Sequence, residues 1–249
     1  EIAQCLVGSE MCIRDRDRRW CAKKNEASEK IKLEDYDKEN CKIDNAFSYI
    51  LSKIGEKTEG YSGCTGDGVL TDEGKYGVRY QGKCPNNYVK FNDELWRIIG
   101  IVDGKVKLVR NESIGSFSWD NKDANNGYGV SNWSDARLMK LLNPGYENET
   151  IGGSLYYNSL SGNCYVAFTN NYKPCNFRST GLKEESKQMI DNSIWYLGGT
   201  FYAGPTKYEI YNFERSDNVY GNYPKSMYGL VGLMYVSAVS YTHLTLPTT

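Results

Sequence analysis

The sequence predicts an α+β fold, built mainly on an antiparallel sheet with two or three helices. From residue 76 to 110, apolar and polar residues alternate with the period of a β-strand, as in "NYVKF", "ELWRIIGI" and "KVKLVR". Other segments repeat apolar residues with the period of a helix. Strands and helices do not follow each other in the βαβ rhythm of a parallel sheet, which favours the α+β class.

The clearest hairpin has its turn at Asp103-Gly104, a dipeptide typical of a type I′ turn, between two apolar runs. Counting back from this turn places Ile99 opposite Leu108. The first strand has apolar residues on both faces, so we expect it to be central in the sheet. The run "VGLMY" at 231–235 is expected to form a final short strand.

Three segments have the pattern of amphipathic helices. The first, "DNAFSYILSKIGEK", follows Asp44 as a possible N-cap residue and ends at Gly55. The second, "WSDARLMKLLN", follows a cap at Asn132 or Ser134, and its apolar face consists of Ala136, Leu138, Met139, Leu141 and Leu142. The third helix is predicted over "GLKEESKQMIDNSIWYL" at 181–197.

The two ends of the chain differ in composition from the rest. Residues 11–16, "MCIRDR", back-translate to the DNA end that a library-preparation transposase recognises, and residues 239–244, "VSYTHL", back-translate to the same element reversed. We therefore interpret 1–16 and 238–249 as translated sequencing-adapter DNA and exclude them from the fold. Such segments are expected to extend away from the domain and to pack poorly.

The remaining chain is expected to be an open fragment with two regions. Residues 17–75 are charged and predict an N-terminal stalk or helical region, and residues 76–237 predict an α+β surface domain that is truncated at its C-terminus. Loss of C-terminal strands would leave an edge of the sheet unpaired.

Six cysteines lie between the two ends, and none forms a C-x-x-C pair. An even number in a chain rich in Gly, Tyr and Asn favours disulfides and an extracellular or cell-surface location; unpaired thiols in a cytosolic protein are the alternative. Cys164 and Cys175 are the first expected pair, because turn residues between them predict a hairpin-like excursion. Cys64 and Cys84 are the next, and Cys21 and Cys41 a looser third.

Residues that carry catalysis are scarce. The lone histidine, His243, lies in the excluded C-terminal end, and there is no nucleotide-binding loop and no G-x-S-x-G motif. The segment "NKDANNG" alternates oxygen-bearing side chains as a calcium loop does, but its glycine is displaced and no bidentate acid follows. The sequence therefore assigns no catalytic residue, no metal site and no cofactor. With a formal net charge of -1, it also gives no sign of nucleic-acid binding.

Tyrosines in loop-like sequence are the candidate ligand-binding residues, since their rings could stack on sugars. We single out Tyr202, Tyr220 and Tyr223, which lie among Gly, Asn and Pro. The alternative for any aromatic residue is a place in the core, which is favoured for Trp96, Trp133 and Trp195.

Several blocks resemble an uncharacterised family of bacterial surface proteins of Gram-positive type from gut communities, over roughly residues 76–235. They include "NNYVKFNDELWRIIGI", "NWSDARLMKLLNPGYENET" and "TGLKEESKQMIDNSIWYLGG". Some members of that family carry a prepilin-like or signal-anchor N-terminus. The resemblance implies a surface location, with membrane attachment only through a lost N-terminal anchor. The helix start after Trp133 is also similar to that of C-type-lectin-like folds.

Two hypotheses about function follow. The first is an extracellular, disulfide-bearing display or binding domain without catalytic activity in this fragment, whose partner is a glycan or another surface protein. The alternative is an extracellular hydrolase whose catalytic residues lie in a missing C-terminal part. The scarcity of catalytic motifs favours the first.

Overall fold

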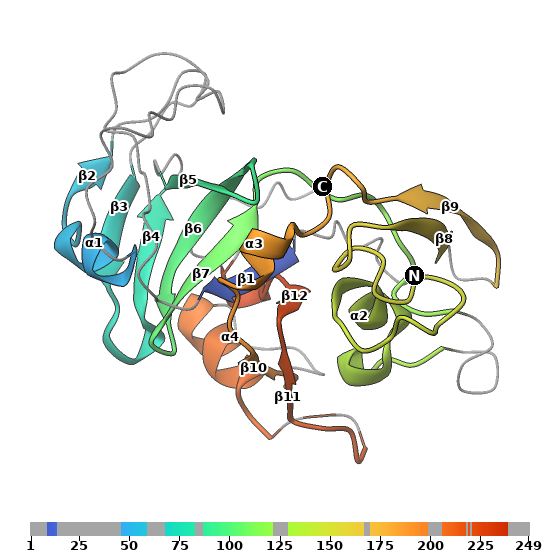
Figure 1. Cartoon of the computed structure of the whole chain (residues 1–249). Coiled ribbons are helices and arrows are strands. Elements are labelled where there is room, and N and C mark those ends of the chain that lie inside the picture. The colour runs from blue at the N-terminus through green and yellow to red at the C-terminus, as the bar shows by residue number, and fades with distance from the viewer. Residues whose placement is uncertain are drawn as a thin grey trace, which may run out of the picture. The chain divides into compact units, whose positions relative to one another are not determined.

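The computed structural model describes residues 9–13, 46–58, 68–82, 87–121, 129–166, 170–198, 206–217, 219 and 221–238. The chain divides into two compact units, each assembled from separate stretches of sequence (Figure 1). The sheet unit comprises Glu10–Glu112, Gly204–Asn212 and Met234–Thr249. The hairpin unit comprises Glu1–Ser9, Ser113–Ala203 and Phe213–Leu233.

An antiparallel sheet forms the sheet unit, with the strand order β1-β7-β6-β4-β3-β2 and with β5 also paired to β6. Its strands are β1 (Ser9–Ile13), β2 (Lys57–Thr58), β3 (Gly68–Asp72), β4 (Val78–Gly82), β5 (Tyr88–Phe91), β6 (Glu94–Val102) and β7 (Lys105–Arg110). Its helical elements are α1 (Ala46–Ser52), the 3-10 turn η2 (Gly74–Tyr76) and α4 (Lys207–Glu214) up to Asn212. The mixture of helices and antiparallel strands confirms the α+β class.

The hairpin between β6 and β7 has the predicted turn but a different register. Asp103 and Gly104 have φ values of 52° and 73°, as a type I′ turn requires. Farther from the turn, a β-bulge follows Ile98, so that Leu108 lies opposite Ile98. The predicted pairing of Ile99 with Leu108 is therefore wrong, because the bulge adds one residue to β6 that a count from the turn does not include.

Two glycines allow β4 and β6 to lie unusually close together. A Cβ atom at Gly100, whose φ is +146°, would stand 1.9 Å from the carbonyl oxygen of Val78. A Cβ atom at Gly77 would stand 2.2 Å from the carbonyl oxygen of Ile101. No real Cβ atom tolerates such a distance to backbone, so any side chain at either position would push the two strands apart.

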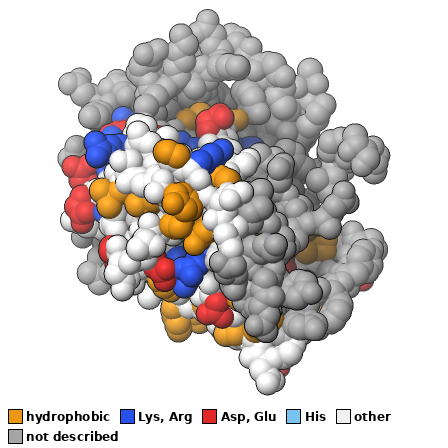
Figure 2. All heavy atoms as spheres, turned by 90° about the vertical axis from the view of Figure 1, so that its right-hand side faces the viewer, with side chains coloured by type: hydrophobic (Ala, Val, Ile, Leu, Met, Phe, Trp, Pro, Cys, Tyr) orange, Lys and Arg blue, Asp and Glu red, His pale blue; other side chains and the backbone are white. Residues whose placement is uncertain are grey.

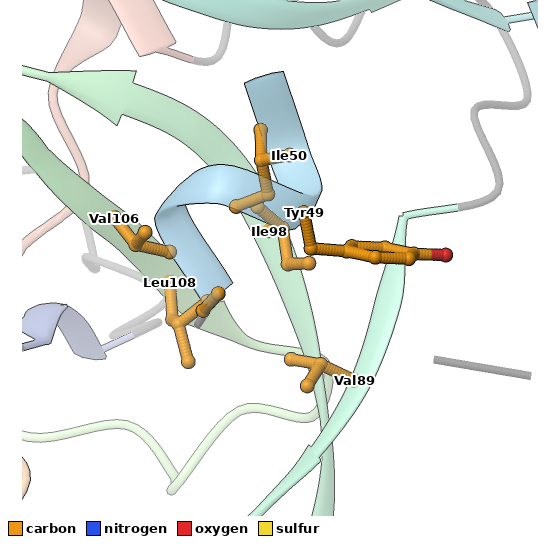
Figure 3. A pocket seen from close by; sticks show the side chains of 7 residues that line it. Tyr49, Ile50, Val89, Ile98, Val106 and Leu108 are labelled. Carbon is orange, nitrogen blue, oxygen red and sulfur yellow. The ribbon is translucent and has the colours of Figure 1, made fainter. Parts of the chain in front are cut away.

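The two faces of the sheet are covered by different elements. On one face, Ala46 and Ile50 of α1 pack over Ile98 and Leu108 (Figure 3). On the other face, Ile99 and Val109 form a buried cluster with Ala238, against which Tyr235 packs. Because both faces are covered, β6 is a central strand, as its apolar sequence predicts.

The two ends of the chain contribute to this unit, in contrast to the expectation that they pack poorly. Residues 9–13 pair with β7 as an added antiparallel strand, and Ala238 is fully buried. The outer side of β7 is thus paired, because its N–H and C=O groups are available to an extended segment within reach. The other residues of 1–16 and 238–249 lie outside the described residues.

The predicted boundary between a stalk and a domain at residue 75 falls inside the sheet. β3 pairs with β4 from Gly68 opposite Gly82 to Asp72 opposite Val78. Residues 46–58 and 68–75 therefore belong to the sheet unit, and the other residues of the predicted 17–75 region lie outside the described residues. The prediction missed the short strands β2 and β3, because the region is rich in charged residues and the strand that pairs with each of them lies downstream in the sequence.

The hairpin unit is built around a short helix, the β8–β9 hairpin and a second two-stranded sheet of β10 and β11. Its elements are η3 (Trp133–Asp135), α2 (Arg137–Leu142), β8 (Ser161–Tyr165), β9 (Tyr172–Asn176), α3 (Glu184–Lys187), β10 (Ser193–Tyr196), β11 (Ser226–Gly229) and β12 (Val231–Leu233). The predicted apolar face of the second helix is buried, at Ala136, Leu138, Met139, Leu141 and Leu142. Among the helices of the described ranges, none is long and apolar enough to cross a membrane.

The buried side chain of Asn143 links the end of α2 to the start of β12 by hydrogen bonds. The Oδ1 atom of Asn143 accepts hydrogen bonds from the backbone N–H groups of Leu230 and Val231, at 3.0 and 3.1 Å. Its Nδ2 atom donates to the carbonyl oxygens of Met139 and Val231, at 3.1 and 2.9 Å. All four polar contacts of the amide are used, which compensates for its burial.

The predicted third helix is wrong over most of its length. Only Glu184–Lys187 is α-helical, and Ser193–Tyr196 forms β10, paired with β11. The segment "SIWY" combines a β-branched and two aromatic residues, which favour a strand once a partner is present. Trp195 lies in the core with 4 % exposure, as Trp96 and Trp133 do at 0 and 7 %, so the core assignment of these three tryptophans is confirmed.

We predict that Gly100→Ala destabilises the sheet unit by about 3 kcal/mol, because its methyl group would overlap a backbone carbonyl. Gly104→Ala is the matched control: its φ is also positive, at +73°, but nothing lies within 4 Å of the added atom, so about 1 kcal/mol is expected. Urea unfolding of each full-length variant, followed by circular dichroism, measures the difference. Equal losses at the two sites would contradict the close-approach argument.

Candidate functional site

Two cavities that are lined by described residues are too small for a ligand. The cavity between α1 and the sheet has a volume of about 20 Å³ and an apolar lining that includes Ile50, Val106 and Leu108 (Figure 3). A second cavity, beside α2 in the hairpin unit, measures about 10 Å³. A water molecule needs roughly 10–15 Å³, whereas small-molecule sites occupy roughly 300–1,000 Å³. Both cavities are therefore packing gaps, and the surface of the described residues offers the better candidate for a site.

Large hydrophobic side chains reach the surface (Figure 2). The exposed ones among the described residues include Tyr172, Tyr208 and Tyr228. Of the three predicted ligand-binding tyrosines, Tyr202 and Tyr220 lie outside the described residues, and Tyr223 is half-buried just before β11. The tyrosines that the structure brings together are others: Tyr76, Tyr208 and Tyr211. We call these three the tyrosine cluster.

The tyrosine cluster joins η2 to α4, two elements that are distant in the sequence. The ring centroids of Tyr76 and Tyr208 are 4.7 Å apart with an interplanar angle of 44°, and those of Tyr76 and Tyr211 are 5.2 Å apart and nearly perpendicular at 83°. Tyr208 and Tyr211 lie on one face of α4, because residues three apart in a helix are neighbours. Both arrangements fall within the range of favourable aromatic pairs.

A capping box starts α4 and so positions these two tyrosines. The Thr206 hydroxyl accepts a hydrogen bond from the backbone N–H of Glu209 at 3.2 Å, and the Glu209 carboxylate accepts one from the backbone N–H of Thr206 at 3.0 Å. The pattern T-x-x-E in "TKYE" is a sequence signal for this motif. Because the surrounding sequence is loop-like, the prediction missed it, and with it the helix that carries the site.

A carboxylate at the rim of the sheet holds the cluster together. Glu73 accepts hydrogen bonds from the Tyr208 hydroxyl and from the Gln81 side chain, and the Lys207 ammonium lies 3.6 Å from its carboxylate. The same ammonium donates to Gln81 at 2.8 Å. Burial alone would raise the pKa of Glu73, but the hydrogen bonds and the Lys207 charge together hold that pKa below its ordinary value.

Cations lie against the tyrosine rings. The guanidinium of the buried Arg79 stands 5.5 Å from the ring centroid of Tyr211, and its Nε atom donates to the Tyr76 carbonyl at 2.9 Å. The ammonium of Lys75 stands 5.0 Å from the Tyr76 ring. Tyr211 is thereby fixed beneath the surface with 5 % exposure, while Tyr208 stays 37 % exposed. The result is a rigid aromatic surface with hydrogen-bonding groups beside it.

The hairpin of β8 and β9 carries the predicted disulfide. Cys164 lies opposite Lys173 and Cys175 opposite Gly162, so the two cysteines occupy diagonal positions on the same face of the hairpin. They form a disulfide with a Cα–Cα distance of 5.8 Å, within the range that the bond requires. The predicted pairing is confirmed. Cys64 and Cys84, and likewise Cys21 and Cys41, lie outside the described residues.

We predict that the Glu73 contacts are lost in acid. Since the folded-state pKa of Glu73 lies below its unfolded value of about 4.5, its contribution to stability is present above that pH and disappears as the pH falls through the folded pKa. The free energy of unfolding should therefore fall less steeply between pH 6 and pH 3 in Glu73→Gln than in the wild-type chain. Urea unfolding at a series of pH values gives the two slopes.

The exposed Glu185 of α3 provides the control for this titration. Glu185→Gln should keep the wild-type pH dependence, because Glu185 takes part in none of the contacts described above for Glu73 and the tyrosine cluster. A Glu73→Gln slope that equals the wild-type slope would contradict the assigned role of Glu73.

Comparison of the chain with protein-family models, with curated proteins and with solved structures finds no match in any of the three.

Proposed function

We propose that the chain is an extracellular or cell-surface domain that carries a disulfide and binds a ligand on its surface without catalysing a reaction. The extracellular location is supported by the Cys164–Cys175 disulfide. The bond lies in the β8–β9 hairpin, and most of β9, including Tyr172 and Lys173, is exposed. Cytosolic thiol systems keep most cysteines reduced, whereas secreted proteins retain disulfide bonds.

The disulfide should form on export and should matter for stability. In a bacterial host, the chain directed to the periplasm is expected to protect Cys164 and Cys175 from alkylation, as peptide mass mapping would show. The double variant Cys164→Ser/Cys175→Ser should lose about 3 kcal/mol of unfolding free energy on the chain-entropy model. Its matched control is the wild-type chain after reduction, which should lose a similar amount. Alkylation of both thiols in the exported, folded chain would remove the main support for an extracellular home.

A glycan is the ligand class that best suits the tyrosine cluster. The exposed ring of Tyr208 offers an apolar face for the C–H groups of a sugar, and Lys75 and Asn212 offer exposed polar groups nearby. Glu73 pairs with Lys207 at the cluster, and the chain as a whole has a formal net charge of -1, which does not favour a nucleic acid as the ligand.

A glycan array probed with the labelled full-length chain tests this assignment. Tyr208→Ala should abolish binding to every glycan that the wild-type chain retains. Tyr228→Ala is the matched control, because Tyr228 of β11 is 66 % exposed and belongs to the hairpin unit. Absence of any glycan signal, or equal loss in both variants, would count against the tyrosine cluster as a glycan site.

A further inference from the structure

Tyr76 and Tyr208 form a pair of phenol rings, one of which is open to solvent. Their ring centroids are 4.7 Å apart at an interplanar angle of 44°, and Tyr208 is 37 % exposed. The third ring of the tyrosine cluster is less accessible, because Tyr211 is only 5 % exposed and stands nearly perpendicular to Tyr76. A reagent in solution therefore reaches the pair through the ring of Tyr208.

Hydrogen bonds hold the two rings in this arrangement. The Tyr208 hydroxyl donates to the carboxylate of Glu73, the residue just before η2, and the side-chain amide of Asn212 donates to the Tyr76 hydroxyl at 3.5 Å. Groups that are fixed side by side react with each other at effective concentrations far above the micromolar concentration of a protein in solution. Reaction between these two rings should therefore be faster than reaction between two molecules.

The reaction that suits two adjacent phenols is oxidative coupling. A one-electron oxidant removes one electron from each phenol. The hydroxyl proton of Tyr208 passes through the Glu73 carboxylate to solvent, and that of Tyr76 passes to water. The two radicals then form one C–C bond between ring carbons ortho to the hydroxyls, and the hydrogens on those carbons move to the oxygens, which restores both phenols.

Hydrogen peroxide balances this reaction. One peroxide molecule takes up the two electrons and the two protons, its O–O bond breaks, and two water molecules form. The protein loses two hydrogen atoms and gains one C–C bond. A haem peroxidase supplies the one-electron steps, and because Tyr208 is exposed, the enzyme needs no access to the interior of the sheet unit.

We propose that Tyr76 and Tyr208 are an oxidative modification site, at which hydrogen peroxide and a haem peroxidase join the two side chains as dityrosine. The bond anchors α4 to η2, two elements that are distant in the sequence, and it restricts the unfolded chain as a disulfide does. The modification does not depend on glycan binding at the tyrosine cluster.

Treatment of the full-length chain with a haem peroxidase and limiting hydrogen peroxide tests the proposal. The monomer, isolated by gel filtration, should show dityrosine fluorescence. Mass spectrometry of its proteolytic peptides should find the peptides of Tyr76 and Tyr208 joined with the loss of two hydrogen atoms. The urea midpoint of the cross-linked monomer should rise by roughly 1 M, because the new bond closes a long loop.

Phenylalanine variants identify the two rings, because they keep the aromatic ring and remove the hydroxyl that is oxidised. Tyr76→Phe and Tyr208→Phe should each lower the dityrosine yield of the monomer at least tenfold. Tyr228→Phe is the matched control: Tyr228 is 66 % exposed but lies in the hairpin unit, so this change should leave the yield of the monomer as it is in the wild-type chain.

Four results would overturn the proposal. They are the absence of dityrosine from the wild-type monomer, cross-linked peptides that join only other tyrosines, equal yields in Tyr208→Phe and Tyr228→Phe, and an unchanged urea midpoint after cross-linking. If a phenylalanine variant fails to fold, the peptide map of the wild-type monomer still decides the question, because it identifies the two coupled residues directly.

Discussion

The sheet unit depends on the absence of a side chain at residue 100. β6 is the strand that β4, β5 and β7 all contact, and β4 reaches it only because Gly100 and Gly77 let two backbones approach closely. The bulge just before Gly100 has a second consequence. It turns Ile98 toward α1 and leaves Ile99 for the cluster on the opposite face, so a single strand supplies both cores.

Outside the central strands of the sheet, α4 and the β8–β9 hairpin are held by a few specific contacts. In the sheet unit, α4 is held by Glu73 and by the aromatic contacts of Tyr76. In the hairpin unit, the Cys164–Cys175 bond closes the β8–β9 hairpin. Each contact joins segments that would otherwise separate at low energetic cost, and each leaves part of the element exposed. An arrangement of this kind presents preformed surfaces to large ligands, which is why the proposed activity is binding.

Residues 9–13 raise two separate questions: where the segment comes from, and why it pairs with β7. The composition of that segment concerns its origin, whereas its place in the sheet follows from the backbone groups of the β7 edge. Backbone hydrogen bonds form with nearly any extended segment whose apolar residues fall on the correct face. The observed pairing of residues 9–13 therefore follows from the backbone of β7 and is independent of the origin of the segment.

Features governed by local chemistry were determined by the sequence alone. These include the turn at Asp103-Gly104, the apolar face of α2 and the hairpin that brings Cys164 to Cys175, because each depends on residues a few positions apart. Only the tertiary structure decided that Ser193–Tyr196 is a strand, since its partner β11 lies far downstream. The same holds for the tyrosine cluster: η2 and α4 meet through folding of the whole unit, and no periodicity within either segment records that contact.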